Sequence, residues 1–158
     1  MYSIQRETAI NSNSCALACI VSLCRDFAVF KNHTQAEFIT RHQKDHPNWG
    51  AEPGGLTPYQ FIAFARSYLE TKAHVIVQDP VWLWKYWQKP EKLGGVFISQ
   101  RQPTPDNQTI SIQHCWRILD MHKDGAKLMN PKTDGALEID VDWSFMTTWK
   151  AYGIILER

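Results

Sequence analysis

The sequence lacks an excess of charge of either sign. Its 17 lysines and arginines nearly balance its 16 aspartates and glutamates, which leaves a formal net charge of +1. Proteins that bind nucleic acids or anionic membranes usually show a basic excess or a basic stripe. We therefore expect neither a nucleic acid nor a membrane as a partner.

The sequence also lacks a long apolar run and a secretory leader. No apolar segment approaches the roughly 20 residues that a membrane-spanning helix needs. The first residues, 1–8, include Gln5, Arg6 and Glu7 and contain no apolar core, so they do not resemble a signal peptide. The sequence predicts a protein of the cytoplasm, or one that is secreted by a non-classical route.

No internal repeat, low-complexity tract or linker divides the chain. With 158 residues it is long enough to bury one proper core, but too short for two independent folds. We therefore expect a single domain that spans residues 1–158.

The four cysteines do not indicate a disulfide framework. Cys15, Cys19 and Cys24 fall within one predicted helix, where neighbouring turns do not offer the geometry of a bridge, and the fourth is Cys115. We expect all four to be free thiols, which is natural in a reducing compartment.

The first half of the sequence is rich in helix signals. Asn13 and Ser14 are good N-cap residues, and they precede a segment from Cys15 to Arg25 whose apolar residues lie nearly all round a helical wheel. Such a helix should be buried in the centre of the domain. Capping residues, prolines and glycines predict three more helices, over about 34–46, from 58 to near 72, and from 80 to the Gly94–Gly95 pair.

The second half alternates with a period of two and predicts strands. The expected strands cover residues 73–78, 96–99, 110–121, 126–129, 137–141 and 152–156, with a polar loop over 100–108 and a short aromatic helix or turn over 142–150. Asp124-Gly125 is typical of a hairpin turn. Helices followed by an antiparallel sheet predict an α+β fold in which the central N-terminal helix packs on the C-terminal sheet.

Cys15 is the candidate nucleophile because of its place at the start of the first helix. A helix N-terminus offers unpaired amides and a partial positive charge, and both stabilise a thiolate. Cys19 and Cys24 lie further along the helix and are expected to be ordinary packed thiols. A cysteine by itself is more often a buried packing residue than a catalytic one, so the assignment requires a base.

His114 is the candidate base, and Asn130 is the candidate for orienting it. His114 lies on a predicted strand, which would hold it rigidly, as general-base catalysis requires. The predicted hairpin returns the chain so that Asn130 lies alongside that strand, where its amide oxygen can accept the second ring proton. The alternative is that Asn130 is simply a turn asparagine before Pro131.

These segments resemble those of papain-like cysteine peptidases. The run from Asn13 to Ile20, Asn-Ser-Cys-Ala-Leu-Ala-Cys-Ile, is similar to the nucleophile segment of that superfamily. The most similar patterns are those of the leader peptidase domains of bacteriocin exporters and of papain-like bacterial effector proteases. The resemblance implies a papain-like fold and a catalytic triad of Cys15, His114 and Asn130.

One position departs from the pattern of these peptidases. They place a glutamine six residues before the nucleophile, where its side-chain amide contributes to the oxyanion hole, and this sequence has Ala9 there. Gln5 lies ten residues before Cys15 and is the oxyanion-hole donor that we expect. Asn11 and Asn13 are the alternatives.

The resemblance implies a cysteine peptidase that hydrolyses peptide bonds and acts as a bacterial effector or toxin. The expected partners are a protein or peptide substrate and a cognate inhibitor or immunity protein; no cofactor and no metal are expected. One alternative is a glutamine deamidase or transglutaminase-like toxin, since the same triad attacks side-chain amides. A second is a non-catalytic papain-like binding module, which the missing glutamine suggests, and a third is a structural α+β adaptor.

Overall fold

The computed structural model describes residues 15–27, 34–45, 58–69, 71–99, 102–103, 109–110, 114–131 and 138–158. Its helices are α1 (Cys15–Asp26), α2 (Gln35–Asp45), α3 (Pro58–Leu69), α4 (Pro80–Trp87) and α5 (Ser144–Thr148). Its strands are β1 (Ala73–Val77), β2 (Lys92–Ser99), β3 (Gln102–Pro103), β4 (Thr109–Ile110), β5 (His114–His122), β6 (Gly125–Met129), β7 (Glu138–Asp142) and β8 (Ala151–Glu157).

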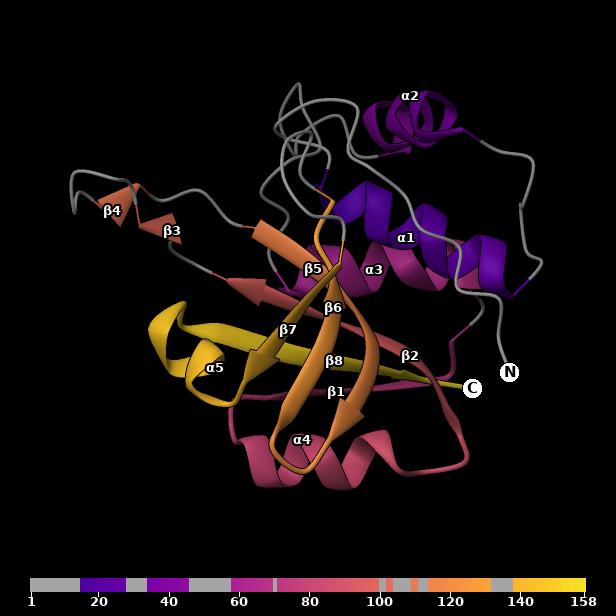
Figure 1. Ribbon diagram of the computed structural model, residues 1–158. Coiled ribbons are helices and arrows are strands. Elements are labelled where there is room, and N and C mark those ends of the chain that lie inside the picture. Colours follow the sequence, from indigo (N-terminus) through magenta and orange to yellow (C-terminus); the bar gives the residue numbers. More distant parts are fainter. Residues whose placement is uncertain are drawn as a thin grey trace.

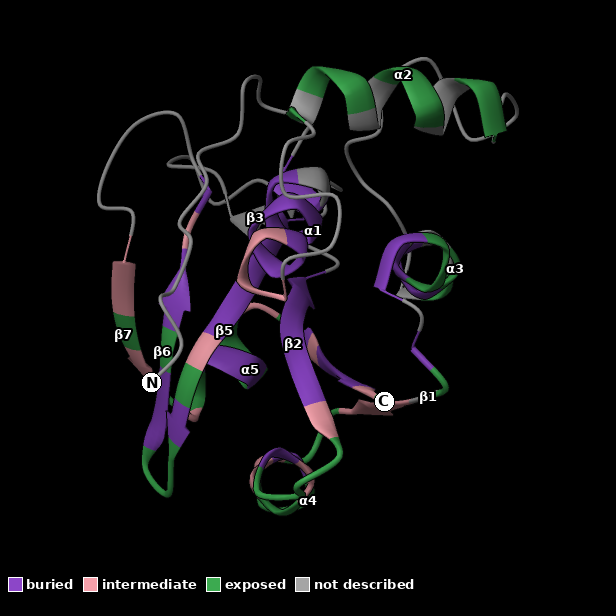
Figure 2. Ribbon diagram, turned by 90° about the vertical axis from the view of Figure 1, so that its right-hand side faces the viewer, coloured by how far each residue is buried: buried purple, intermediate pink, exposed green. Residues whose placement is uncertain are grey.

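Six of the strands form one sheet in the order β1-β8-β2-β5-β6-β7. Every neighbouring pair in it is antiparallel. Helices α1, α2 and α3 lie on one side of the sheet, and α4 lies on the other (Figures 1 and 2). The domain is therefore α+β, with the N-terminal helix packed on an antiparallel sheet, as the sequence predicts.

Helix α1 is the buried centre of the first apolar core. Its residues Ala18, Cys19, Ile20, Leu23 and Cys24 have no measurable exposure. They pack with α3 and with one face of the sheet, to which β2, β5, β6 and β8 contribute. The nearly continuous apolar wheel of this segment predicts such burial, because a helix with no polar face has no side to turn toward water.

A second core fills the opposite face of the sheet. It joins Leu83 and Trp87 of α4 to Phe145 and Met146 of α5, over alternate residues of the strands such as Trp116. Residues that alternate along a strand point to opposite faces, so β5 contributes Cys115 to the first core and Trp116 to the second.

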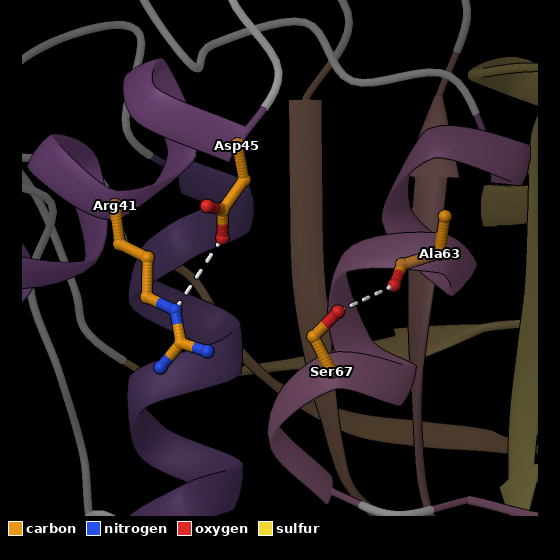
Figure 3. Close-up of polar contacts among 4 residues, drawn as sticks. All are labelled: Arg41, Asp45, Ala63 and Ser67. Carbon is orange, nitrogen blue, oxygen red and sulfur yellow. Dashed lines mark hydrogen bonds and ion pairs between the residues drawn. The ribbon is translucent and has the colours of Figure 1, made fainter.

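Helices α2 and α3 carry their own local contacts. A capping box begins α2, in which the Glu37 amide donates to Thr34 Oγ1 (3.2 Å) and the Thr34 amide donates to the Glu37 carboxylate (3.4 Å). Arg41 of α2 pairs with Asp45 one turn later at 3.4 Å (Figure 3), and its guanidinium lies 4.8 Å from the centre of the Tyr68 ring in α3. In α3 the Ser67 hydroxyl donates to the Ala63 carbonyl at 3.3 Å (Figure 3).

Two helices end earlier than the sequence suggests. We expected α4 to continue to Gly94-Gly95, but it ends at Trp87, and both glycines lie inside β2. A proline at position 90 prevents the helix from continuing, since proline has no amide to donate. Helix α3 ends at Leu69 rather than near Lys72, because the Lys72 amide donates to the Glu157 carbonyl of β8 at 3.1 Å.

Two residues of the expected polar loop over 100–108 belong to a strand. Gln102 and Pro103 of β3 pair with Ile110 and Thr109 of β4 in a small two-stranded ladder. The long strand that we expected over 110–121 is represented by β4 and β5; residues 111–113 between them lie outside the described part of the chain.

Candidate functional site

Cys15 is the first residue of α1 and lies against the beginning of β5. Its side chain is buried, with 4% of its surface exposed. Its thiol is within hydrogen-bonding reach of the Cys115 backbone amide as well as of its own amide and that of Ala16. The Cys115 amide belongs to the peptide group that joins Cys115 to His114, so the sulfur lies beside the β5 backbone just after the residue that begins this strand.

The protonation of Cys15 is dominated by its burial. Burial, and to a smaller extent the neighbouring Cys19, raise the pKa of the Cys15 thiol from 9.0 to about 12. The three backbone amides act in the opposite direction, since each stabilises the thiolate, but they do not outweigh the desolvation. The amides at the helix N-terminus thus lower the pKa of Cys15 as expected, but less than burial raises it, so a thiolate at Cys15 requires a further positive charge.

His114 and Asn130 are in direct contact. His114 Nε2 lies 2.8 Å from Asn130 Oδ1, across the hairpin formed by β5 and β6. His114 is buried at the first position of β5, and Asn130 directly follows β6 and is half-buried. The turn at Asp124, which the sequence signals clearly, thus brings together two residues that are sixteen positions apart.

This contact selects one tautomer of the imidazole. An amide oxygen can only accept a hydrogen bond, so Nε2 is the ring nitrogen that donates to Asn130 Oδ1. In a neutral ring Nδ1 then carries the lone pair and can accept a proton. A base needs this arrangement if it is to take a proton from a thiol.

Two residues that the sequence did not single out hold His114 in place. The His114 amide donates to Ser99 Oγ at 3.3 Å, and Ser99 is completely buried opposite it on β2. The His114 ring meets the ring of Trp116 edge to face, with 4.3 Å between ring centres. Trp116 also stacks edge to face with Phe145 of α5, at 4.9 Å. The cross-strand pairing that selects Ser99 depends on register, which sequence patterns do not specify.

The remaining cysteines are buried free thiols, as expected. The Cys19 thiol donates to the Cys115 carbonyl at 3.7 Å, which ties the second turn of α1 to β5. Burial raises the pKa of Cys115 well above 9.0, and burial raises that of Cys24 to about 12. Neither Cys24 nor Cys115 lies at a helix N-terminus.

Gln5, the expected oxyanion-hole donor, lies outside the described residues, as do its alternatives Asn11 and Asn13 and the departing position, Ala9. The backbone amide of Cys15, at the first position of α1, is a donor of the type that an oxyanion hole uses.

The described ranges bear on three other kinds of site: a metal centre, a membrane span and a pocket. Those ranges contain no group of three or more histidine, cysteine or acidic side chains able to hold a metal ion. No helix in the described part of the chain is both long and apolar enough to cross a membrane. A recess of about 500 Å³ opens at the far end of α1, beside Asp26 and Arg117. It lies a helix length, roughly 16 Å, from Cys15 and does not extend the Cys15 site.

The elements and their order define the fold of a papain-like C39 peptidase domain. Two solved structures share it over nearly their whole length. The first is the peptidase domain of Streptococcus ComA, a bifunctional ABC transporter involved in quorum sensing, with a TM-score of 0.65, 14% identity, and 98% of each chain covered. The second is a Bacillus anthracis protein described as a C39-like peptidase, with a TM-score of 0.63, 13% identity, and 99% of this chain and 96% of that one covered.

Sequence comparisons give no further match. No family model matches the chain, and no curated protein does either. At 13–14% identity, the two structures establish the fold and leave the activity to be argued from the site.

Proposed function

We propose that this protein is a cysteine peptidase in which Cys15 is the nucleophile, His114 the general base and acid, and Asn130 the residue that orients His114. The observation that carries the proposal is the 2.8 Å contact between His114 Nε2 and Asn130 Oδ1, at the start of the strand whose next residue, Cys115, presents its backbone amide to the buried thiol of Cys15. A histidine held by an amide oxygen next to a thiol at a helix N-terminus is the arrangement that nucleophilic thiol chemistry needs.

The proposed reaction is acyl transfer to the thiol. His114 takes the proton of Cys15, and the resulting thiolate attacks the carbonyl carbon of the scissile amide. His114 then protonates the leaving amine as the C–N bond breaks, which leaves a thioester on Cys15. Water, deprotonated by His114, attacks the thioester and releases the carboxylate product and the free thiol. The Cys15 amide and Gln5 would stabilise the oxyanion.

The raised pKa of Cys15 sets a condition on this mechanism. A thiol with a pKa of about 12 is almost entirely protonated at neutral pH, so the thiolate must be stabilised by an adjacent imidazolium. The same burial is the observation that favours the alternative, a non-catalytic binding module on a papain-like scaffold. The two proposals differ in whether Cys15 becomes reactive through His114.

The decisive experiment is iodoacetamide labelling of the native protein across pH, with each cysteine followed by peptide mass spectrometry. We expect Cys15 to react well below pH 8, and His114→Ala to remove that reactivity, so that labelling rises only toward the pKa of about 12 that burial imposes. His122→Ala is the matched control, because His122 lies on the same strand and is exposed. Cys24, whose pKa burial also raises to about 12, serves as an internal reference.

Two labelling results would contradict the peptidase proposal. If Cys15 is labelled no faster than Cys24, or if His114→Ala and His122→Ala behave alike, there is no thiolate–imidazolium pair, and the binding module is the better description.

If Cys15 proves reactive, intact-mass analysis of candidate substrates separates peptidase from deamidase. Proteolysis yields two fragments, whereas deamidation adds about one dalton to an intact protein. We also propose a role as a bacterial effector or toxin that cleaves a protein or peptide substrate and is blocked by a cognate inhibitor or immunity protein. This proposal rests on the resemblance to papain-like effector proteases.

A further inference from the structure

Helix α4 turns an aromatic and basic face away from the protein. Leu83 and Trp87, one turn apart, pack into the second core. On the opposite side Val81 is 61% exposed, Trp82 is 53% exposed and Lys85 is exposed. The structure describes three exposed large apolar side chains, and Val81 and Trp82 are two of them. Exposed apolar side chains that cluster among polar residues are typical of an interaction site.

The lysines of this face lie over its aromatic rings. Lys85 Nζ is 4.6 Å from the centre of the Trp82 ring, and Lys89 Nζ is 4.5 Å from that of Tyr86. The Trp82 and Tyr86 rings are themselves 6.4 Å apart. Val81, Trp82, Lys85, Tyr86 and Lys89 therefore form one continuous surface, which we call the outer face of α4.

Within the segment from Asp79 to Glu91, acidic residues stand only at the two ends. Asp79 precedes the helix, and its carboxylate accepts the Val81 amide at 2.8 Å as the N-cap. Glu91 follows in the turn to β2. No acidic residue occurs from position 80 to position 90, so both charges on the outer face are positive.

The place of α4 in the molecule indicates the shape of the partner. In both views α4 lies at the edge opposite α1, α2 and α3, and no described helix or strand lies beyond it (Figures 1 and 2). The exposed side of a single helix at an edge is convex. A convex surface suits a flat partner, whereas a protein that held a helix would need a groove shaped to it.

We propose that the outer face of α4 docks peripherally on a bilayer that carries anionic lipid headgroups. Trp82, Tyr86 and Val81 would lie at the level of the headgroups and upper acyl chains, where amphipathic rings are favoured. Lys85 and Lys89 would extend to the lipid phosphates, with their alkyl stems along the rings.

The proposal departs from the expectation that the chain has no membrane partner. That expectation rests on a net charge of +1, which averages over the whole sequence. The fold separates the charges and leaves a local face whose two charges are both basic. Two lysines and one exposed tryptophan predict a weak, reversible association that salt can reverse.

Vesicle co-sedimentation of the whole protein tests the proposal. We expect about tenfold more protein to sediment with vesicles of phosphatidylcholine mixed with phosphatidylglycerol than with phosphatidylcholine alone, and high salt to remove the difference. Lys85→Glu/Lys89→Glu and, separately, Trp82→Ala should each lower binding severalfold. Lys44→Glu/Arg66→Glu, which makes the same charge change at exposed residues of α2 and α3, should bind like the wild type.

Three results would overturn the proposal. The first is equal binding to neutral and anionic vesicles, or no binding to either. The second is an equal loss in the α2–α3 control variant, which would reduce the effect to net charge. The third is binding of polyglutamate, or concentration-dependent self-association lost in Trp82→Ala, without vesicle binding; these would assign the face to an acidic protein or to a second copy. Circular dichroism confirms that each variant is folded. Cys15→Ala should bind normally, so this test is independent of the proposed peptidase activity.

Discussion

At the scale of single residues, the candidate site depends on one amide oxygen. Asn130 Oδ1 accepts from His114 Nε2, and this leaves Nδ1 as the nitrogen that can take a proton. The sequence leaves two interpretations of Asn130 open: it either orients the His114 ring or is only a turn residue before Pro131. The 2.8 Å contact makes the first one testable.

Substitution of Asn130 separates these readings. We expect Asn130→Ala to lower the rate constant for hydrolysis about tenfold to hundredfold, because the imidazole loses the acceptor that holds its orientation. Asn130→Asp keeps an acceptor and adds a negative charge that stabilises the imidazolium form of the ring, so the alkaline limb of the pH–rate profile should move to higher pH. The measurement is kcat/KM against pH, or Cys15 alkylation if no substrate is known. Unchanged profiles in both variants would make Asn130 a turn residue.

At the scale of elements, β2 occupies a central place in the sheet. It pairs with β5 on one side and β8 on the other, and it carries Ser99 opposite His114. Its two glycines allow close approach. A Cβ at Gly94 would lie 2.7 Å from Leu23 Cδ2 of α1, and one at Gly95 would lie 2.6 Å from the Ile154 carbonyl oxygen of β8.

These two contacts predict different costs for the same substitution. Leu23 Cδ2 is the end of a flexible side chain and can move, whereas the Ile154 carbonyl is part of the backbone. We expect Gly95→Ala to lower the free energy of unfolding by about 3 kcal/mol and Gly94→Ala by about 1 kcal/mol. Urea denaturation of both variants measures the difference. Equal losses would show that β2 and β8 can separate as readily as Leu23 can turn.

At the scale of the whole molecule, a buried ion pair joins the helical layer to the sheet. Arg117 of β5 contacts the Asp26 carboxylate at the end of α1, and both side chains are almost fully buried. Arg117 Nη1 also donates to Ser22 Oγ at 2.6 Å. The two elements that this pair connects are the ones that carry Cys15 and His114, so it helps to fix the distance between the candidate nucleophile and base.

Breaking only one side of this pair should be costly. We expect Arg117→Met to lower the free energy of unfolding by about 3 to 5 kcal/mol, because the Asp26 carboxylate would remain buried without its cation. Arg117→Met combined with Asp26→Leu should lose less than Arg117→Met alone, since no buried charge is left. Thermal or urea unfolding of the single and double variants checks this. A double variant as unstable as the sum of the singles would mean that the two residues do not interact.

The sequence by itself determined the local features of this protein. Residue types and their spacing predict the burial of α1, its start at Cys15, the Asp124 turn and the strands on both sides of it, because these depend on contacts between residues near each other in the chain. The catalytic roles of Cys15, His114 and Asn130 remain predictions. The predicted end of α4 was wrong. Glycine favours the end of a helix when only the local sequence is considered, but Gly94 and Gly95 lie in β2, where the absence of a side chain allows close packing against Leu23 and Ile154.

Only the tertiary structure decided the features that depend on segments distant in sequence. Strand register places Ser99 opposite His114, and helix packing buries Cys15 and raises its pKa to about 12, where a helix terminus exposed to water would lower it. The fold also brings lysines and aromatic rings together on the outer face of α4, and the net charge of the whole chain does not reveal this local basic surface. Desolvation, register and surface charge all depend on which elements meet, and that is set by the packing of the whole chain rather than by local sequence.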